Sequence, residues 1–175
     1  PVVVATDTTI WVDISGNWTI DTSYVHVSSS DNCDIDSVWL SRTMFTCNDA
    51  SAVQNDTLFV TDISGNLTAV PVLITVLDTF RPAIVVTDTT VWLDQTGSFT
   101  IDTTFINDGS WDNCYIDTMW LSRYSFSCGD TIAPQSVRFY AQDSTGNVDS
   151  ADVFVTVIDS LVPNLVTTDT TIYLD

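Results

Sequence analysis

The sequence predicts an all-β fold, and three observations lead to this prediction. All 23 acidic residues are Asp and all 4 basic residues are Arg, so Glu and Lys, the charged residues that favour helices, do not occur. Thr, Val, Ile and the aromatic residues, which suit strands, are abundant instead. Apolar and polar residues also alternate, most clearly over residues 153–158, which is the period of a strand with one buried face.

An internal repeat of 81 residues organises the chain. Residues 7–13 (DTTIWVD) return as residues 88–94 (DTTVWLD) and again as residues 169–175 (DTTIYLD). Self-similarity at a fixed period is the signature of tandem structural units. The expected domains are residues 1–81, residues 82–162 and, as the first strand of a third repeat in a longer array, residues 163–175.

Short strands separated by turns are expected along each repeat. In the second repeat Asp94–Gly97 and Asp143–Asn147 each combine an Asp that can cap its own turn with a Gly that can adopt positive φ. The runs between such turns predict strands, in order, near residues 83–86, 90–93, 98–101, 118–122, 136–142 and 151–158. Short strands at this spacing, in a repeat of this size, are typical of a seven-stranded β-sandwich.

The charge of the chain limits its partners. A formal net charge of −19 repels nucleic acids and anionic membranes, and it makes cations the natural small partners. No apolar run approaches the length of a membrane span, so direct membrane insertion of this segment is not expected. The lack of Lys also excludes Schiff-base chemistry and a phosphate-binding P-loop.

Each repeat contains two cysteines at the same spacing, Cys33 and Cys47 in the first and Cys114 and Cys128 in the second. Metal or redox chemistry is the less favoured interpretation, because there is no CxxC pair and the only histidine, His26, is not repeated. A disulfide within each repeat is expected instead, closing a local loop and stabilising the fold by about 3 kcal/mol. Such bonds indicate an oxidising, extracellular setting.

Asp positions recur between the repeats, since eight of the ten Asp residues of the first repeat return as Asp in the second. Two interpretations are open: Asp caps turns and keeps the protein soluble, or it supplies some of the about six to eight oxygen ligands that calcium takes. The candidate calcium ligands are Asp31, Asn32, Asp36, Asp62, Asn66 and Asp78 in the first repeat and Asp112, Asn113, Asp117, Asp143, Asn147 and Asp159 in the second.

Four tryptophans at equivalent positions of the two repeats are candidates for lateral contacts between chains: Trp11, Trp39, Trp92 and Trp120. A repeat of this size has limited core volume for so many large aromatic side chains, so some of them are expected on the surface. The other interpretation, that they are core or strand-face aromatics, is open as well.

Several motifs of each repeat resemble those of a known family. In the second repeat these motifs are residues 88–94, Asp112-Asn113-Cys114, Leu121-Ser122-Arg123, residues 143–147 (DSTGN) and residues 155–159 (VTVID). Over essentially the whole chain they resemble hyalin-type (HYR-like) immunoglobulin-like repeats, and they are similar to the tandem repeats of giant surface proteins exported by type IX secretion in gliding and predatory marine bacteria. The resemblance implies tandem immunoglobulin-like β-sandwich repeats that act as adhesion modules or filament shafts. Residues 148–151 depart from the family pattern, because a further Cys is common there.

The resemblance also implies O-glycosylation, because the acceptor motif of the bacterial group looks like Asp followed by Ser or Thr and then by an apolar residue or Thr. The candidate acceptors are Ser37, Thr57, Thr89, Thr103, Thr118, Thr131, Ser150 and Ser160. The plain abundance of Asp and Thr explains the same pattern, and both interpretations are open.

An enzyme is not expected, because catalysis needs an acid, base or nucleophile placed once in a pocket, whereas the carboxylates here are distributed along the repeats. The expected function is that of a structural and adhesive segment of a giant extracellular filament or cell-surface appendage. Such a segment would transmit force and self-assemble laterally with other copies of the same chain. The alternative is a stalk that binds ligands or cell-surface glycans, with an avidity that grows with the number of repeats. Calcium is the candidate cofactor.

Overall fold

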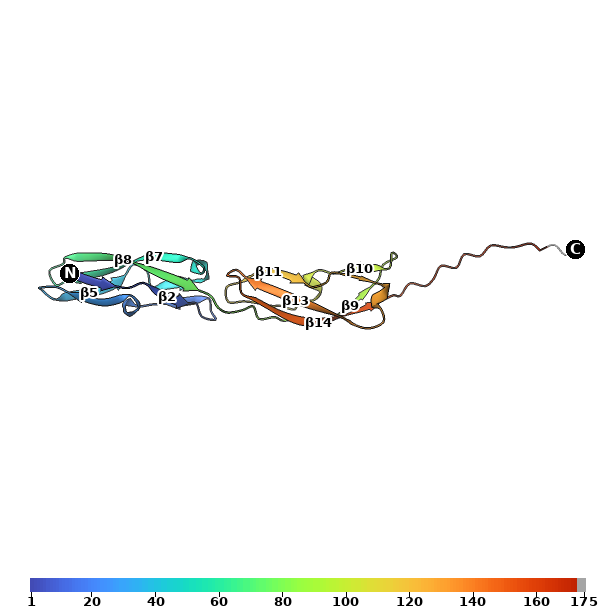
Figure 1. The fold of residues 1–175 in the computed structure, drawn as a ribbon, viewed down its shortest axis with the longest axis horizontal. Coiled ribbons are helices and arrows are strands. Elements are labelled where there is room, and N and C mark those ends of the chain that lie inside the picture. Colours follow the sequence, from blue (N-terminus) through green and yellow to red (C-terminus); the bar gives the residue numbers. More distant parts are fainter. Residues whose placement is uncertain (173–175) are drawn as a thin grey trace. The chain divides into compact units, whose positions relative to one another are not determined.

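The structure is a computed structural model that describes residues 1–172, and it is all-β (Figure 1). Strands and short 3-10 helices make up its regular structure, and no α-helix occurs in the described range. The fold class expected from the Asp, Thr and Val content is therefore confirmed. Within these residues no helix combines the length and the apolar character that a bilayer crossing requires.

The secondary structure repeats as the sequence does. The first repeat contains β1 (Val2–Ala5), β2 (Thr8–Trp11), β3 (Asn17–Thr19), η1 (Thr22–Tyr24), β4 (His26–Ser30), β5 (Ile35–Leu40), β6 (Met44–Thr46), η2 (Cys47–Asp49), β7 (Val53–Asp62) and β8 (Leu67–Leu77). The second contains β9 (Thr89–Trp92), β10 (Ser98–Thr100), η3 (Thr103–Phe105), β11 (Ile116–Leu121), β12 (Ser125–Ser127), η4 (Cys128–Asp130), β13 (Gln135–Asp143) and β14 (Val148–Ile158). Strands β9, β10, β11, β12 and β14 begin 81 residues after β2, β3, β5, β6 and β8, so the sequence period is also a structural period.

The strands of each repeat form an immunoglobulin-like β-sandwich. In the first repeat a four-stranded sheet has the order β2-β8-β7-β5, while β1 pairs with β4 and β3 pairs with β6. The corresponding four-stranded sheet of the second repeat has the order β11-β13-β14-β9, and β10 pairs with β12. In both sheets one edge strand is parallel to its neighbour: β2 lies parallel to β8, with Ile10 opposite Val76, and β9 lies parallel to β14, with Val91 opposite Val157.

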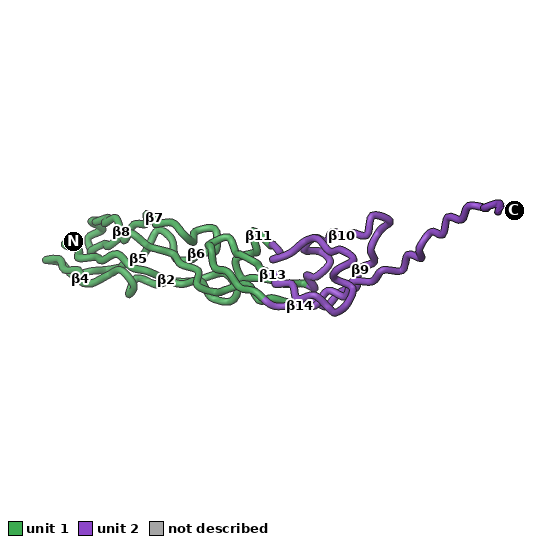
Figure 2. Tube along the Cα trace, turned by 45° about the vertical axis from the view of Figure 1, so that its right-hand side comes forward, with its two compact units in different colours: residues 1–85, 109–119, 140–150 green, residues 86–108, 120–139, 151–175 purple. Residues whose placement is uncertain are grey.

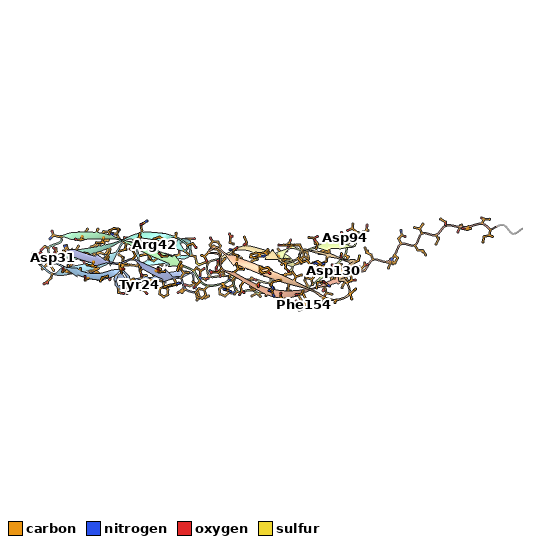
Figure 3. The ribbon with its side chains drawn as sticks, in the orientation of Figure 1. Tyr24, Asp31, Arg42, Asp94, Asp130 and Phe154 are labelled. Carbon is orange, nitrogen blue, oxygen red and sulfur yellow. A yellow bond between two sulfur atoms is a disulfide. The ribbon has the colours of Figure 1, made fainter. Side chains whose placement is uncertain are left out.

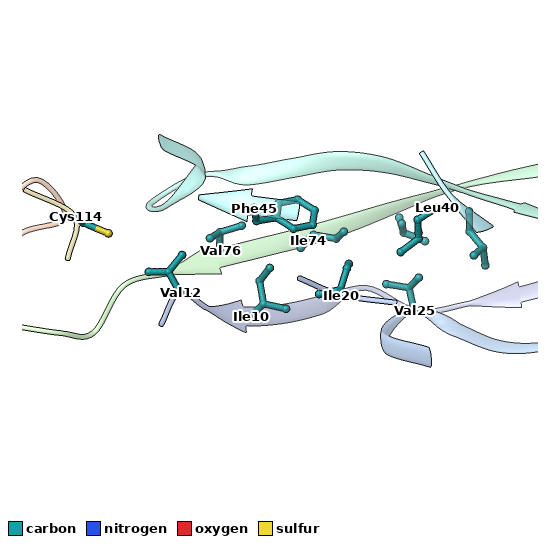
Figure 4. Packing of buried hydrophobic residues seen from close by; sticks show 11 residues of the cluster. Ile10, Val12, Ile20, Val25, Leu40, Phe45, Ile74, Val76 and Cys114 are labelled. Atoms are coloured by element: carbon teal, nitrogen blue, oxygen red, sulfur yellow. The ribbon is translucent and has the colours of Figure 1, made fainter. Parts of the chain in front are cut away.

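Alternating burial along the long strands creates the core between the layers. Leu58 and Val60 of β7 are fully buried, while Thr57, Phe59 and Thr61, which alternate with them, are only partly buried. Ile10 of β2 and Ile74 of β8 pack in one cluster with Phe45 of β6, from the other layer (Figure 4). Since burial of each such side chain contributes about 1.5–3 kcal/mol, this cluster holds the two layers of the first repeat together.

The same alternation holds in β14 of the second repeat. Val153, Val155 and Val157 are buried, while Phe154 between them is exposed (Figure 3). The alternation expected over residues 153–158 is therefore confirmed, and it places one face of this strand in a core.

Two details of the strand prediction need correction. Residues 83–86 form only isolated bridges, to Asn107 and Trp111, whereas all four of their equivalents in β1 pair with β4, with one shift of register after Val4. Gly109, at φ +92°, interrupts the segment that would be the partner strand, and a glycine in this conformation cannot continue a regular ladder. The structure also contains β12, which the sequence did not predict because three residues are too few to show a period and no glycine turn precedes them, as one does before β10.

An arginine–aspartate pair closes the same short helix in both repeats. Arg42 donates to Asp49, which also accepts from the backbone N–H of Thr46 and so caps η2. Arg123 and Asp130 form the equivalent pair in the second repeat. The hydrogen bond from Arg42 holds the pKa of Asp49 below its usual range.

The chain divides into two compact units (Figure 2). The first contains residues 1–85, 109–119 and 140–150, and the second contains residues 86–108, 120–139 and the described residues from 151 onward. The whole first repeat therefore shares a unit with two segments of the second repeat, and the candidate site lies in this unit.

The expected third repeat falls at the end of the chain. Residues 163–172 contain no strand, and residues 173–175 lie outside the described residues. The repeat boundaries at residues 81 and 162, and the first strand of a third repeat at 163–175, therefore stay predictions.

Candidate cation site and inter-repeat disulfide

One disulfide joins the two repeats. Cys47, at the start of η2, is bonded to Cys114, in the loop before β11, and their Cα atoms lie 5.2 Å apart within the first compact unit. Cys33 and Cys128 are free and exposed. The expected pairs, Cys33 with Cys47 and Cys114 with Cys128, are thus wrong for this structure. The bond spans 67 residues of sequence rather than 14.

The expected pairing fails because the two cysteines of one repeat lie at opposite ends of it. Beside the first cysteine, the carbonyl of Asp34 accepts from the backbone N–H of Ile63, just past the end of β7. Beside the second, the carbonyl of Asp49 accepts from the side chain of Gln54, at the start of β7. The ten residues of β7 span about 30 Å, whereas a disulfide needs Cα atoms roughly 4–7 Å apart.

A glycine turn lies directly against the disulfide. Gly16 is buried and has φ +72°, and a Cβ atom there would lie 2.6 Å from the carbonyl oxygen of Asn113 and 2.7 Å from Sγ of Cys47. The side chain of Asn113 also donates to the carbonyl of Asp13 in the same turn, over 3.0 Å. The turn of the first repeat and the loop of the second are therefore in close contact, and only glycine fits at this point.

Three aspartates meet beside this contact. Asp78 follows β8, Asp112 lies in the loop that carries Cys114, and Asp143 ends β13. One carboxylate oxygen of each lies within 4.8 Å of those of the other two. The cluster thus combines a residue from the end of the first repeat with residues from two separate parts of the second.

Neutral donors position two of these carboxylates. Asp143 accepts from the backbone N–H groups of Thr145 and Asn147, both over 2.8 Å, and from the Asn147 side chain over 2.8 Å. Asp78 accepts from the side chain of Asn113 over 3.3 Å and from the hydroxyl of Thr145 over 3.4 Å. Thr145 therefore contacts two of the three aspartates and helps to hold them together.

Asp112 is the least satisfied member of the cluster. Burial, together with the negative charges of Asp143 and Asp78, raises its pKa above the usual value. Its Oδ2 atom and the Oδ1 atom of Asn113 are buried and accept no hydrogen bond from the described part of the protein. Such a set of oxygen atoms suits a hard divalent cation, whose charge would offset the repulsion between the carboxylates.

The remaining predicted ligands lie elsewhere or play other roles. In the first repeat Asp31 accepts from the backbone N–H of Cys33 at 3.0 Å, and Asp62 accepts from Ser64 and Asn66. The hydrogen bond from Cys33 lowers the pKa of Asp31. Asn32, Asp36, Asn66, Asp117 and Asp159 are exposed.

Sequence reasoning missed two residues of the site, Gly16 and Thr145. Gly16 recurs as Gly97 in an equivalent turn, and this recurrence was a signal that the turn needs a glycine in each repeat. Thr145 has Ser64 as its equivalent, so a hydroxyl recurs at that position too. Neither signal says which part of the chain the residue contacts.

The four candidate tryptophans divide by exposure. Trp11 and Trp92 are exposed by 51% and 55%, so this pair of equivalent positions presents an aromatic surface in both repeats. Trp39 is 40% exposed and stacks on Phe59 with ring centroids 5.4 Å apart, while Trp120 is only partly exposed.

A mostly apolar pocket of about 390 Å³ adjoins the first of these tryptophans. It is lined by Trp11 and Trp18 together with Tyr24 and Phe80. The Nε1–H group of Trp18 is buried and has no acceptor in the described part of the protein.

The candidate O-glycosylation sites also divide by exposure. The exposed ones are Ser37, Thr118, Thr131 and Ser160, and the partly buried ones are Thr57, Thr89, Thr103 and Ser150. The exposed positions are the ones that a modifying enzyme could reach on the folded protein.

No family model matches the chain, and no curated protein matches it. Among solved structures it is similar to human mucin-like protocadherin EC1-2, at 14% identity and a TM-score of 0.38, over 89% of this chain and 98% of that one. Human protocadherin-24 EC1-2 is similar at 11% identity and a TM-score of 0.38, over 91% and 99%. Protocadherin gamma B7 is similar at 12% identity and a TM-score of 0.39, over 89% of this chain but 49% of that one, so the chain spans about half its length. At such scores the likeness tells nothing about what this chain binds.

Proposed function

We propose that the chain is a structural and adhesive segment of an extracellular protein, built from tandem immunoglobulin-like repeats that are fastened to one another. The disulfide between Cys47 and Cys114 carries this proposal, because it joins residues of two successive repeats. Such a bond limits the movement of one repeat against the next and persists in an oxidising, extracellular setting. A segment of this kind transmits force along its length.

Calcium is the cofactor in this proposal. Asp78, Asp112 and Asp143 would supply carboxylate oxygens, and Asn113 would supply its buried Oδ1 atom. When bound, the ion would neutralise the repulsion within the cluster and fasten the end of the first repeat to the second. The support comes from the donor set, because hard oxygen atoms are what calcium takes in proteins.

The finer form of the proposal is a HYR-like array in a giant surface filament or appendage, exported by type IX secretion. Its support is the 81-residue repeat and the sequence motifs named above. The equivalent, exposed Trp11 and Trp92 would serve as lateral contacts with other copies of the same chain. Exposed aromatic side chains at a fixed period suit an interface that recurs along a fibre.

Immunogold electron microscopy of intact cells that produce the protein tests this function. Antibodies raised against residues 1–175 are expected to label external fibres on cells that have not been permeabilised. Labelling confined to the cell interior would overturn the proposal. Fibres of constant width would support lateral assembly, whereas single flexible strings would count against it.

A glycan-binding stalk is the second candidate function. The observation that favours it is the mostly apolar pocket lined by the aromatic side chains of Trp11, Trp18, Tyr24 and Phe80. Aromatic rings stack on the apolar faces of sugars. Binding of the chain to a glycan array, abolished by Trp11→Ala, would support this function, and the absence of binding would remove it.

A further inference from the structure

Each bonded cysteine has a free equivalent one period away. Cys47 corresponds to Cys128, and Cys114 corresponds to Cys33. The bonded pair is sheltered, with Cys114 exposed by only 1%, whereas both free cysteines are exposed. The chain therefore carries the two halves of a second and a third bond, one half towards each end.

The surroundings of Cys128 match those of Cys47. Sγ of Cys47 lies 3.5 Å from the carbonyl oxygen of Gly16, and Sγ of Cys128 lies 3.6 Å from that of Gly97. Both glycines have φ +72°, and a Cβ atom on either would meet the neighbouring sulfur at 2.7 or 2.8 Å. Cys128 is thus held in the position that Cys47 has in the bond.

The glycine turn at Cys128 differs in one respect. At Gly16 the space that a Cβ atom would take is filled by the carbonyl oxygen of Asn113, at 2.6 Å. At Gly97 only Sγ of Cys128 lies within 4 Å of that point in the described chain. The space beside the glycine turn that receives the Asn113 loop, which we call the cradle, therefore has a counterpart at Gly97 in the second repeat. No described residue other than Cys128 fills that counterpart.

The surroundings of Cys33 match those of Cys114 in the same way. The backbone N–H of each donates to the preceding Asp of its Asp-Asn-Cys motif, over 3.0 Å for Cys33 and 2.7 Å for Cys114. The residue after each cysteine has positive φ, +66° at Asp34 and +64° at Tyr115. The loop that enters the cradle at Gly16 is thus preformed at Cys33 as well.

We propose that Cys128 and Cys33 form the same inter-repeat bond with neighbouring copies of the repeat. Cys128 bonds to the equivalent of Cys114 in a following copy, and Cys33 bonds to the equivalent of Cys47 in a preceding copy. As each S–S bond forms, two thiols lose two protons and two electrons, and a small disulfide such as oxidised glutathione accepts them and leaves as two thiols. Every joint of an array would then be crossed by one disulfide, independently of calcium.

A chain lengthened by one period tests the proposal. Residues 82–162 are inserted a second time directly after residue 162, and the inserted copy carries Tyr115→Phe and Thr118→Ser at two exposed positions to change its peptide masses. The protein is folded in a glutathione redox buffer, remaining thiols are alkylated, and the chain is cleaved before Asp residues. Mass spectrometry of the unreduced peptides then identifies each bond.

The expected result is a bond between the original Cys128 and the inserted copy of Cys114, beside the existing bond of Cys47 with the original Cys114. Cys33 and the inserted copy of Cys128 are expected to be alkylated. A bond between the two cysteines of the inserted copy would overturn the proposal. So would alkylation of the original Cys128 in molecules that have formed the Cys47–Cys114 bond.

Two glycine substitutions in the lengthened chain show whether the cradle directs the bond. Gly97→Ala places a methyl group against Sγ of Cys128, whereas Gly109→Ala changes a glycine of similar positive φ that has no atom within 4 Å of its Cβ position. The fraction of Cys128 in the new bond is expected to fall several-fold with Gly97→Ala and to be unchanged with Gly109→Ala. Equal yields in the two variants would contradict the proposed role of the cradle.

Discussion

At the scale of single residues, the ionised carboxylate of Asp112 is expected to lower the stability of the folded state when no cation is bound beside it. Its carboxylate is partly buried beside two other aspartates, and its Oδ2 atom has no hydrogen-bond donor among the described residues. Because its folded-state pKa lies above the unfolded value, its ionised form reduces stability above that raised pKa. The loss disappears as the pH falls through the raised pKa, since the proton then takes the place of a cation.

Asp112→Asn is therefore expected to have opposite effects with and without calcium. In chelator at neutral pH the variant should melt higher by roughly 2 °C, because one uncompensated charge is gone. In calcium it should bind the ion about tenfold more weakly or worse, because one charged ligand is lost. Thermal melts and calcium titrations check both effects, with the exposed Asp117→Asn as the control. A variant that melts lower in chelator would contradict this account of the cluster.

Asp49 has the opposite dependence on pH. Arg42 lowers its folded-state pKa, so its contribution to stability is present above the unfolded pKa and is lost as the pH falls through the lowered one. Asp49→Asn is expected to cost about 1 kcal/mol at pH 7, the usual cost of a lost helix cap. The difference from the unmodified protein should vanish in strong acid. Urea unfolding at both pH values measures it, and an equal cost at the two values would disprove the electrostatic origin.

At the scale of elements, the two glycine turns form a natural pair for comparison. Gly16 and Gly97 have the same φ, but only Gly16 is approached by the backbone of Asn113. Both alanine variants bear a conformational cost of about 1–3 kcal/mol and a close contact with a cysteine sulfur, so Gly16→Ala is expected to cost more than Gly97→Ala because only its methyl group also meets the Asn113 backbone. Urea unfolding of the two variants measures the difference. Equal costs would mean that the Asn113 loop does not lie against the turn in solution.

The elements also show how much of the structure the sequence could predict. The alternation at residues 153–158 and the 81-residue repeat identified an all-β, repeated fold, because strand period and self-similarity are local properties. The three-residue strand β12 was missed because it is too short to have a period and, unlike β10, follows no glycine turn. The loss of strand pairing at residues 83–86 depends on Gly109, a residue in another part of the chain.

The candidate site was predicted in pieces that the sequence could not assemble. Asp78, Asp112 and Asp143 were each named as candidate ligands but not as one site, because the sequence does not show that the end of one repeat meets two segments of the next. The cysteine pairing was wrong for the same reason. A spacing of 14 residues suggests a local loop, whereas the strand direction carries Cys33 and Cys47 to opposite ends of the repeat.

At the scale of the whole molecule, the disulfide should dominate stability. By loop-closure entropy a bond across 67 residues contributes on the order of 4 kcal/mol. Cys47→Ser is therefore expected to lower the melting temperature by roughly 10 °C. Cys33→Ser, which removes a free thiol, is the matched control and should leave it unchanged. If neither Cys47→Ser nor a reductant changes the melting temperature, the bond does not form in solution.

Calcium and the disulfide should act together on the same part of the chain. Chelator and reductant combined are expected to lower the unfolding temperature more than either alone, because the acidic cluster and the Cys47–Cys114 bond fasten the same two repeats. Differential scanning calorimetry in the four conditions measures the two effects. If neither reagent shifts the transition, neither device stabilises the protein.

The Cys47–Cys114 bond also decides which residues would carry tension if the chain were pulled from its ends. The covalent path would run from residue 1 to Cys47, across the sulfur atoms to Cys114, and on to the C-terminal end. Residues 48–113, which include β7 and β8, the longest strands of the first repeat, would lie outside that path. The backbone of these residues would therefore not be stretched directly, and load would reach β7 and β8 only through the strands paired with them, β5 and β2.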